Sequence, residues 1–243
     1  MEPEFTIDVH GMTKIFDGKT VVNGMDLRMR RGEICGFLGP NGSGKTTFIR
    51  MLCGLLHPDG GSGSCLGYNV IRESEKIRLE SGYMTQRFSF YEDLTIAENL
   101  DFVARMFSLP GRRASVEAAL EWLGLANRRN QLAGELSGGW KQRLALAACM
   151  IHKPRLLLLD EPTAGVDPKA RRQFWDTIRT LADGGLTVLV STHYMDEAIR
   201  CDSLAYIAYG NLLVHGTPAE VAGDSTLEEV FVRLMDGVED SYH

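Results

Sequence analysis

The sequence predicts an α/β fold in which a core of buried strands and helices brackets a helical insert. Residues 34–38 and 156–159 are short, continuous apolar runs, which is typical of strands buried on both faces of a parallel sheet. A glycine-rich turn and then a helical pattern follow the first run, over 39–52. From about 95 to 152 the apolar residues recur at helical spacing instead.

The first part of the chain is predicted to be rich in strands. Apolar and polar residues alternate over 5–10, as they do in a half-buried strand, and strand residues continue over 21–29. We interpret 59–64 as the turn of a glycine hairpin and not as a second phosphate loop, because no Lys-Thr pair follows it. A short strand over 65–67 should follow it.

The helical insert and the last part of the chain are predicted from their end signals. Thr95 and Glu98 have the capping-box spacing, at the start of a helix that should end by Ser108. Pro154 should stop the last helix of the insert, because proline cannot continue one. The other predicted elements are helices over 115–123, 140–152, 169–182, 217–222 and 226–235, a buried strand over 187–190, and a hairpin over 204–214 across Gly210-Asn211.

A phosphate-binding loop stands between the first buried strand and its helix. Residues 39–46 match G-x-x-x-x-G-K-[ST] at every fixed position, and the flanking elements are those that polyphosphate binding requires. Lys45 supplies a charge near the terminal phosphates, and the Thr46 hydroxyl can ligate Mg2+. We expect a nucleoside triphosphate to contact Gly39, Pro40, Asn41, Gly42, Ser43, Gly44, Lys45, Thr46 and Thr47.

Two adjacent carboxylates end the second buried strand. In phosphate-loop enzymes the carboxylate at this place holds the metal, so Asp160 is expected in a Mg2+ shell. Strand alternation predicts that Glu161 points the other way, toward the attacking water, as a general base. The alternative is a strand end that carries two solvated acids.

Residues 136–143, Leu-Ser-Gly-Gly-Trp-Lys-Gln-Arg, resemble the signature segment of ATP-binding cassette (ABC) ATPases. With the phosphate loop before it and the Asp-Glu pair after it, the resemblance extends over about 5–235. It implies a P-loop NTPase (RecA-like) core with an N-terminal antiparallel β subdomain and an inserted α-helical subdomain. The resemblance implies one ABC ATPase domain over 1–243. Its nucleotide-binding core with the β subdomain is expected at 1–86 and 153–223. The helical signature subdomain is expected at 87–152, and a short C-terminal helix and tail at 224–243.

The resemblance assigns further roles. It implies that Phe16 stacks on adenine, that Gln86 contacts Mg2+ and water, and that His193 bonds the γ-phosphate or the Glu161 backbone. Taken alone, Phe16 would be a core residue and His193 a structural one. The implied contacts to an ATP held by a second subunit are Ser137, Gly138, Gly139 and Asp167.

One position departs from the family pattern. The usual glutamine of the signature is Trp140 here, which packs either against its own helix or against a partner. The three aromatic residues that follow Gln86 also have two interpretations. They form either a site for a short helix of a membrane partner or an ordinary hydrophobic core between subdomains. They are Phe88, Phe90 and Tyr91.

The implied function is ATP-dependent, head-to-tail dimerisation with a second ABC ATPase domain and reopening on hydrolysis, driving a polytopic membrane subunit. The C-terminal sequence 227–231 resembles cassettes that serve ABC-2 type exporters, so we expect export, with ATP and Mg2+ as cofactors. One alternative is a soluble ABC ATPase that acts on ribosomes or another complex; another is a nucleotide sensor that does not hydrolyse.

Composition limits the remaining classes. A net charge of −6 argues against a nucleic-acid footprint, and no apolar run approaches the ~18 residues that span a bilayer. The N-terminus lacks the plan of a signal peptide, and an odd set of five cysteines without a C-x-x-C pair favours reduced thiols. We therefore expect a cytoplasmic location, peripheral on the inner face of the membrane.

Overall fold

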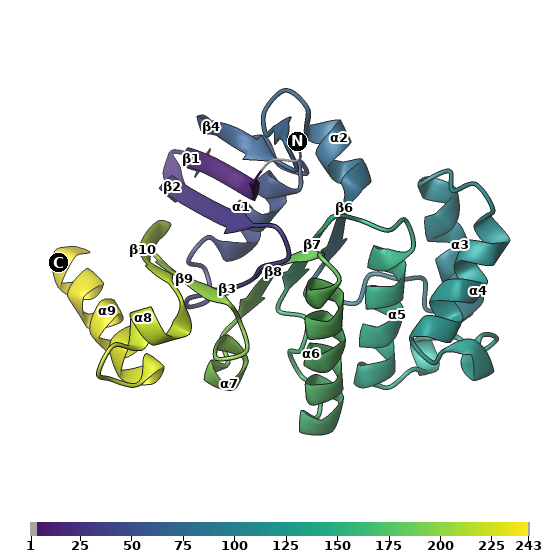
Figure 1. The fold of residues 1–243 in the computed structure, drawn as a ribbon. Helices are drawn as coiled ribbons and strands as arrows, with labels where there is room; N and C mark the ends of the chain where they lie inside the picture. The colour runs from purple at the N-terminus through teal and green to yellow at the C-terminus, as the bar shows by residue number, and fades with distance from the viewer. Residues whose placement is uncertain (1–3, 243) are drawn as a thin grey trace.

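The computed structural model describes residues 4–242, and the side chains of residues 4–236. Its centre is a six-stranded sheet in the order β10-β9-β3-β8-β7-β6 (Figure 1). Neighbouring strands are parallel, except for the β9–β10 hairpin. The strands are β3 (Ile34–Leu38), β6 (Ser81–Met84), β7 (Leu156–Asp160), β8 (Thr187–Thr192), β9 (Ser203–Ala208) and β10 (Asn211–Gly216).

The central strands are buried on both faces, as the apolar runs predicted. Every residue of β3, β7 and β8 is buried. Along β7, Leu156 and Leu158 join one hydrophobic cluster, and Leu157 and Leu159 join the other. The alternation follows from the two-residue period of a strand, and it explains why the run carries no polar residue before Asp160.

A second, four-stranded antiparallel sheet covers one face of the core, in the order β2-β1-β4-β5. Helix α1 (Lys45–Leu52) lies between the two sheets, where its Phe48 ring stacks on Phe37 of β3 at 5.3 Å (Figure 1). The four strands are β1 (Phe5–Phe16), β2 (Lys19–Arg30), β4 (Gly60–Cys65) and β5 (Tyr68–Asn69).

The prediction of a glycine turn over 59–64 is wrong. Residues 60–65 form strand β4. The turn comes later, at Leu66 and Gly67, so the short strand predicted over 65–67 is wrong too: only Cys65 of it belongs to a strand. The glycines are needed because β1 runs so close: a Cβ on Gly63 would lie 2.3 Å from the Asp8 carbonyl oxygen. The close approach of β1 selects glycine in this strand, so its composition is the same as that of a turn.

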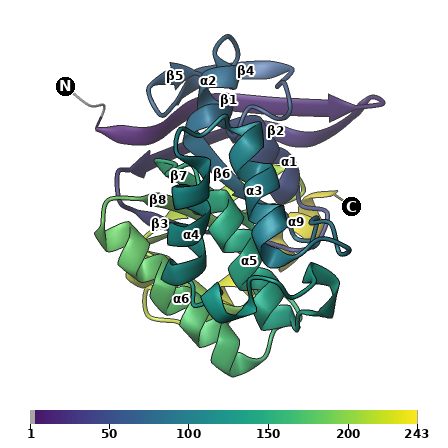
Figure 2. The same cartoon turned by 90° about the vertical axis from the view of Figure 1, so that its right-hand side faces the viewer.

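Three helices form the insert, beyond the β6 edge of the central sheet, and they face the viewer in Figure 2. The Thr95 capping box is confirmed, with both reciprocal hydrogen bonds present at the start of α3. The second helix begins three residues before the predicted 115. The insert contains α3 (Ile96–Met106), α4 (Arg112–Trp122), α5 (Gly138–Met150) and two 3-10 turns, Ala126–Arg128 and Ala133–Glu135.

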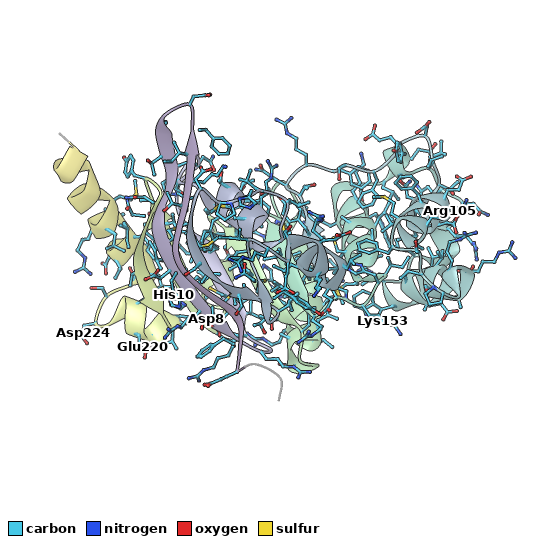
Figure 3. All side chains as sticks on the ribbon, turned by 90° about the horizontal axis from the view of Figure 1, so that it is seen from above. Asp8, His10, Arg105, Lys153, Glu220 and Asp224 are labelled. Atoms are coloured by element: carbon cyan, nitrogen blue, oxygen red, sulfur yellow. The ribbon has the colours of Figure 1, made fainter. Side chains whose placement is uncertain are left out.

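The remaining helices cover the sheet and its C-terminal edge. Figure 3 places Arg105 of α3 at one end of the molecule and Glu220 of α8 at the other. The last helix runs beyond the predicted 235, and its Phe231 stacks on Tyr206 of β9 at 4.4 Å. These helices are α2 (Ser74–Glu80), α6 (Pro168–Asp183), α7 (Met195–Ala198), α8 (Pro218–Ala222) and α9 (Leu227–Tyr242). The sequence did not predict α2, α7, β5 or β6. Within the described residues, no helix has the length and apolarity to cross a bilayer.

Candidate functional site

Four neighbouring strands deliver the predicted residues to one edge of the sheet. β3 leads into the phosphate-binding loop, β7 into Asp160 and Glu161, and β8 into His193; β6 is followed closely by Gln86. The strand order β3-β8-β7-β6 makes these four connections adjacent. Parallel strands present their carboxyl ends at the same edge, where ligands of open α/β sheets bind.

The phosphate-binding loop is folded around its lysine. The Lys45 ammonium is 5% exposed and donates to the carbonyl oxygens of Gly39 at 2.8 Å and Pro40 at 3.0 Å. Burial lowers the pKa of Lys45 from its ordinary value. Gly39, at φ +149°, has no room for a side chain, since a Cβ would lie 2.0 Å from the Ile207 carbonyl oxygen.

One polar atom of this loop is buried and unsatisfied. Ser43 Oγ finds no hydrogen-bond partner among residues 4–242, although the residue is 3% exposed. Buried hydroxyls are normally paired, so an orphan in a phosphate-loop sequence fits an oxygen-rich ligand.

Asp160 joins the loop to two strands. Its Oδ2 accepts a hydrogen bond of 2.7 Å from Thr46 Oγ1, and its Oδ1 accepts one of 2.8 Å from Ser191 Oγ. Asp160 is 4% exposed, so the solvated-acid alternative is wrong for this residue. Hydroxyl and carboxylate oxygens are the donors that Mg2+ prefers, beside water and phosphate. The Thr46–Asp160 pair therefore fits that ion.

The Glu161 carboxylate contacts other partners than the Asp160 carboxylate does, but strand alternation is the wrong explanation. β7 ends at Asp160, and Glu161 has a left-handed backbone with φ +46°. A non-glycine residue there is strained, and such strain concentrates at functional sites. The Glu161 N–H donates to Ser191 Oγ at 2.9 Å, which holds the turn.

The Glu161 carboxylate is 9% exposed and is surrounded by three predicted site residues. Gln86 Nε2 donates to its Oε2 at 3.0 Å, and His193 Nδ1 lies 3.6 Å from the same oxygen. Lys45 Nζ is 4.0 Å from Oε1. Burial excludes the solvated-acid alternative here as well.

His193 differs from its prediction in one detail. Its ring faces the carboxylate of Glu161, whereas the Glu161 backbone N–H is bound to Ser191 Oγ. The side chain of His193 is 45% exposed. It therefore remains open to a ligand at the same edge.

Phe16 is on the surface. Its side chain is 43% exposed and the Lys14 ammonium lies 5.3 Å from its ring centroid, so the alternative of a core residue is wrong. An exposed aromatic face on the β1–β2 hairpin is available for stacking.

The signature residues lie at the start of α5. Ser137 is exposed, and its side chain makes no capping hydrogen bond within the described part of the chain. A Cβ on Gly138 would lie 3.9 Å from the Gly165 carbonyl oxygen, so the signature adjoins the loop before α6. Asp167 has a local role: its Oδ1 caps α6 by accepting from Lys169 N and Ala170 N, both at 3.0 Å.

Trp140 packs within its own chain. Its ring lies between the guanidinium groups of Arg128 and Arg143, 4.4 and 5.0 Å from their central carbons. It is half-buried, so part of the indole stays open to a partner. Phe88 and Phe90 likewise pack against the main cluster and border a cavity of about 230 Å³ beside Gln86.

Sequence reasoning missed several polar residues of this edge. Ser191 links Asp160 to Glu161, and Gln142 Nε2 of α5 donates to the Pro162 carbonyl oxygen. Glu197 binds two threonine hydroxyls. Ser191 could have been found in the sequence, because it is a polar residue that follows the apolar residues of a strand. Gln142 and Glu197 could not, because their roles depend on contacts between distant segments.

The sequence is similar to proteins of a known family. A family model described as ABC transporter matches residues 22–164. The probable multidrug ABC transporter ATP-binding protein YbhF of Escherichia coli is 40% identical over 242 residues, which is 96% of this chain and 42% of that protein. The daunorubicin/doxorubicin resistance ATP-binding protein DrrA of Streptomyces peucetius is 40% identical over 238 residues, covering 97% and 72%. The Nod factor export ATP-binding protein I of Burkholderia lata is 42% identical over 219 residues, covering 89% and 72%.

Solved structures agree on the fold. An ATP-binding subunit of an ABC transporter superposes with a TM-score of 0.84 at 27% identity, covering 95% of this chain and 99% of the other. A dimeric ATP-binding cassette in a post-hydrolysis state, bound to ADP and Pi, gives 0.78 at 25% identity, covering 87% and 98%. The present chain spans less than half of YbhF but most of DrrA. It belongs to the ABC transporter family and has the fold of that family's ATP-binding cassette.

Proposed function

We propose that this chain binds ATP at residues 39–47 and hydrolyses it with Glu161 as the general base. The observation that carries the proposal is the surroundings of the Glu161 carboxylate, which meets Gln86 at 3.0 Å, His193 at 3.6 Å and Lys45 at 4.0 Å. A non-hydrolysing sensor has no need of a strained, buried carboxylate at the phosphate loop.

The residues divide the work. Lys45 leaves its loop carbonyls to pair with the terminal phosphates, and the Ser43 hydroxyl gains the partner it lacks among residues 4–242. Gln86 and His193 hold the Glu161 carboxylate where it accepts a proton from water. Mg2+ fits Thr46, Asp160 and Gln86, and when bound it neutralises phosphate charge.

The signature completes the site of a second cassette. The start of α5 carries a partial positive charge and exposes Ser137 and Gly138, so it suits an anion. A head-to-tail pair then holds each ATP between one chain's 39–47 and the other's Ser137, Gly138, Gly139 and Asp167. The solved dimeric cassette supports this arrangement.

We further propose that the pair drives export through an ABC-2 type membrane subunit. The cavity beside Gln86 borders the Glu161 contact, so a partner seated there senses the state of the site. The names of the relatives, multidrug transporter and Nod factor export, support a membrane exporter over a ribosomal ATPase. The cassette is then peripheral on the cytoplasmic face.

Phosphate release tests the catalytic proposal. Glu161→Gln should retain ATP binding, lose about 100-fold or more of kcat, and accumulate as an ATP-bound dimer, because a carboxamide cannot accept the proton. Glu80→Gln is the matched control, since Glu80 bonds Tyr68 and Arg155 away from the phosphate loop. Equal turnover in Glu161→Gln and the wild type would remove Glu161 from the base role.

Co-purification from detergent extracts tests the coupling. A polytopic membrane protein should accompany the wild type and be lost with Ser89→Arg, which fills the mouth of the cavity. Ser62→Arg, at an exposed residue of strand β4, is the control and should retain the partner. Recovery of ribosomes in place of a membrane protein would favour the soluble alternative.

A further inference from the structure

A second glutamate near the site is more deeply buried than Glu161. Glu197, in α7, is 1% exposed. Its Oε1 accepts a hydrogen bond of 2.6 Å from Thr163 Oγ1, and its Oε2 accepts one of 2.5 Å from Thr192 Oγ1. Two hydroxyl donors satisfy the carboxylate, so burying it requires both threonines in place.

These two threonines flank the proposed catalytic groups. Thr163 follows Glu161 by two residues, and Thr192 directly precedes His193. Thr192 Oγ1 also accepts the Tyr194 N–H at 3.1 Å, which fixes the backbone on the other side of His193. Glu197 is therefore a side-chain link between the loop that carries the base and the loop that carries the histidine, in addition to the Ser191 contact.

The loop after Glu161 is held from a second direction. The Pro162 carbonyl oxygen accepts from Gln142, four residues into the signature helix α5. Residues 162 and 163 are thus tied to α5 on one side and, through Glu197, to the end of β8 on the other. A shift of any one connection moves Glu161 relative to His193.

We propose that Glu197 is a positioning residue that keeps the Glu161 carboxylate and the His193 ring in register through its bridge between Thr163 and Thr192. It does not touch the substrate. The inference rests on the proposed function, because it assigns Glu197 a role in the same hydrolysis. Misplacing a catalytic group by about 1 Å can cost about 100-fold in rate, so a rigid link here has a measurable effect.

Strand β8 provides a matched control at its other end. The Thr187 hydroxyl is also buried and bonds the hydroxyl of Thr6 at 2.9 Å. Thr187→Val and Thr192→Val therefore remove the same buried group from the two ends of one strand. Only Thr192 contacts Glu197.

Steady-state kinetics form the first test. Thr163→Val, Thr192→Val and Glu197→Ala should each lower kcat about 10-fold or more and leave the ATP KM within about 2-fold, because the phosphate loop is untouched. Thr187→Val should leave both constants unchanged. On a His193→Ala background the Thr192→Val loss should shrink below about 2-fold, since residues that act as a unit are not additive. Full additivity, or equal losses in Thr187→Val, would overturn the positioning role.

Amide hydrogen exchange forms the second test and needs no turnover. Protection of the Tyr194 amide should fall about 10-fold or more in Glu197→Ala and stay at the wild-type value in Thr187→Val. Unchanged protection in Glu197→Ala would overturn the bridge. If the wild type hydrolyses ATP and the variants Thr163→Val, Thr192→Val and Glu197→Ala are equally active, this inference alone is refuted. If the wild type does not hydrolyse ATP although its Tyr194 amide is protected, the proposed function is refuted instead.

Discussion

At the amino edge of the six-stranded sheet, polar side chains pair with one another; at the carboxyl edge, one buried hydroxyl has no partner among the described residues and one buried cation bonds only its own loop. Thr187 bonds Thr6 at 2.9 Å at the amino edge, and Glu80 pairs with Arg155 at 2.8 Å. At the carboxyl edge the Ser43 hydroxyl is equally buried, yet it has no partner within residues 4–242. Lys45 there bonds only carbonyl oxygens of its own loop, with carboxylates further away.

The difference shows which edge of the sheet contains groups that lower the stability of the fold. A buried hydroxyl without a partner and a left-handed Glu161 both cost free energy, typically about 1–3 kcal/mol each. They persist at the edge where the strand order gathers the phosphate loop, Asp160 and His193. At the amino edge, which the proposed chemistry does not use, the polar groups named above pair with one another, and His152 is the exception.

The largest expected effect separates two cations at opposite edges. Lys45→Ala should weaken ATP binding about 100-fold, because charge-assisted hydrogen bonds to phosphate are lost. Arg155→Ala removes a cation whose partner is Glu80, so ATP affinity should be unchanged. Isothermal titration calorimetry measures both. An equal loss in the two variants would show that the two edges do not differ as we describe.

A smaller effect is expected from charging the neighbour of the base. Gln86→Glu places a second carboxylate against Glu161, where Gln86 Nε2 now donates at 3.0 Å. Like charges in contact repel, so the Glu161 carboxylate should be displaced from its position beside His193. The kcat measured by phosphate release should therefore fall about 10-fold. An unchanged kcat would contradict the assignment of Glu161 as the base.

The amino edge should respond in stability alone. Thr187→Val leaves the Thr6 hydroxyl and the Gly32 N–H without their partner, so unfolding in urea should be easier by about 1–3 kcal/mol. ATP turnover should keep its wild-type value. Lost turnover with unchanged stability would reverse the comparison.

The smallest effect concerns the exception at the amino edge, His152. Its ring stacks on Phe107 at 3.8 Å, and its Nδ1 is buried without a partner in the described chain. Burial lowers the pKa of His152 below its usual 6.5. The unfolded chain therefore binds the proton more readily, and the stability from neutral His152 is complete above pH 6.5 and is lost as pH falls toward the folded pKa.

The melting temperature of the wild type should fall more steeply than that of His152→Gln as the pH is lowered from about 7.5 to 5.5, because glutamine does not titrate. The measurement is the difference between wild-type and variant melting curves across that range. A difference that stays constant with pH would show that His152 does not titrate in this way.

The features that the sequence predicted correctly are those formed by residues close together in the chain. The phosphate loop, the buried strands and the Thr95 capping box each lie within a few residues, and the structure contains all three. The glycine strand β4 was misread because the reason for its glycines is the approach of β1, about fifty residues earlier. The turn at Glu161 was misread because Ser191, thirty residues away, holds it.

By itself, the sequence determined the chemistry of this protein: which residues can cradle phosphate, which can hold a cation, and that an ATP-binding cassette is present. Those signals are local, because a loop or a strand end is made by neighbours in the chain. Only the tertiary structure decided how the groups meet. The placement of Gln86 against Glu161 and the bridge from Thr163 through Glu197 to Thr192 depend on strand order and on contacts between distant segments.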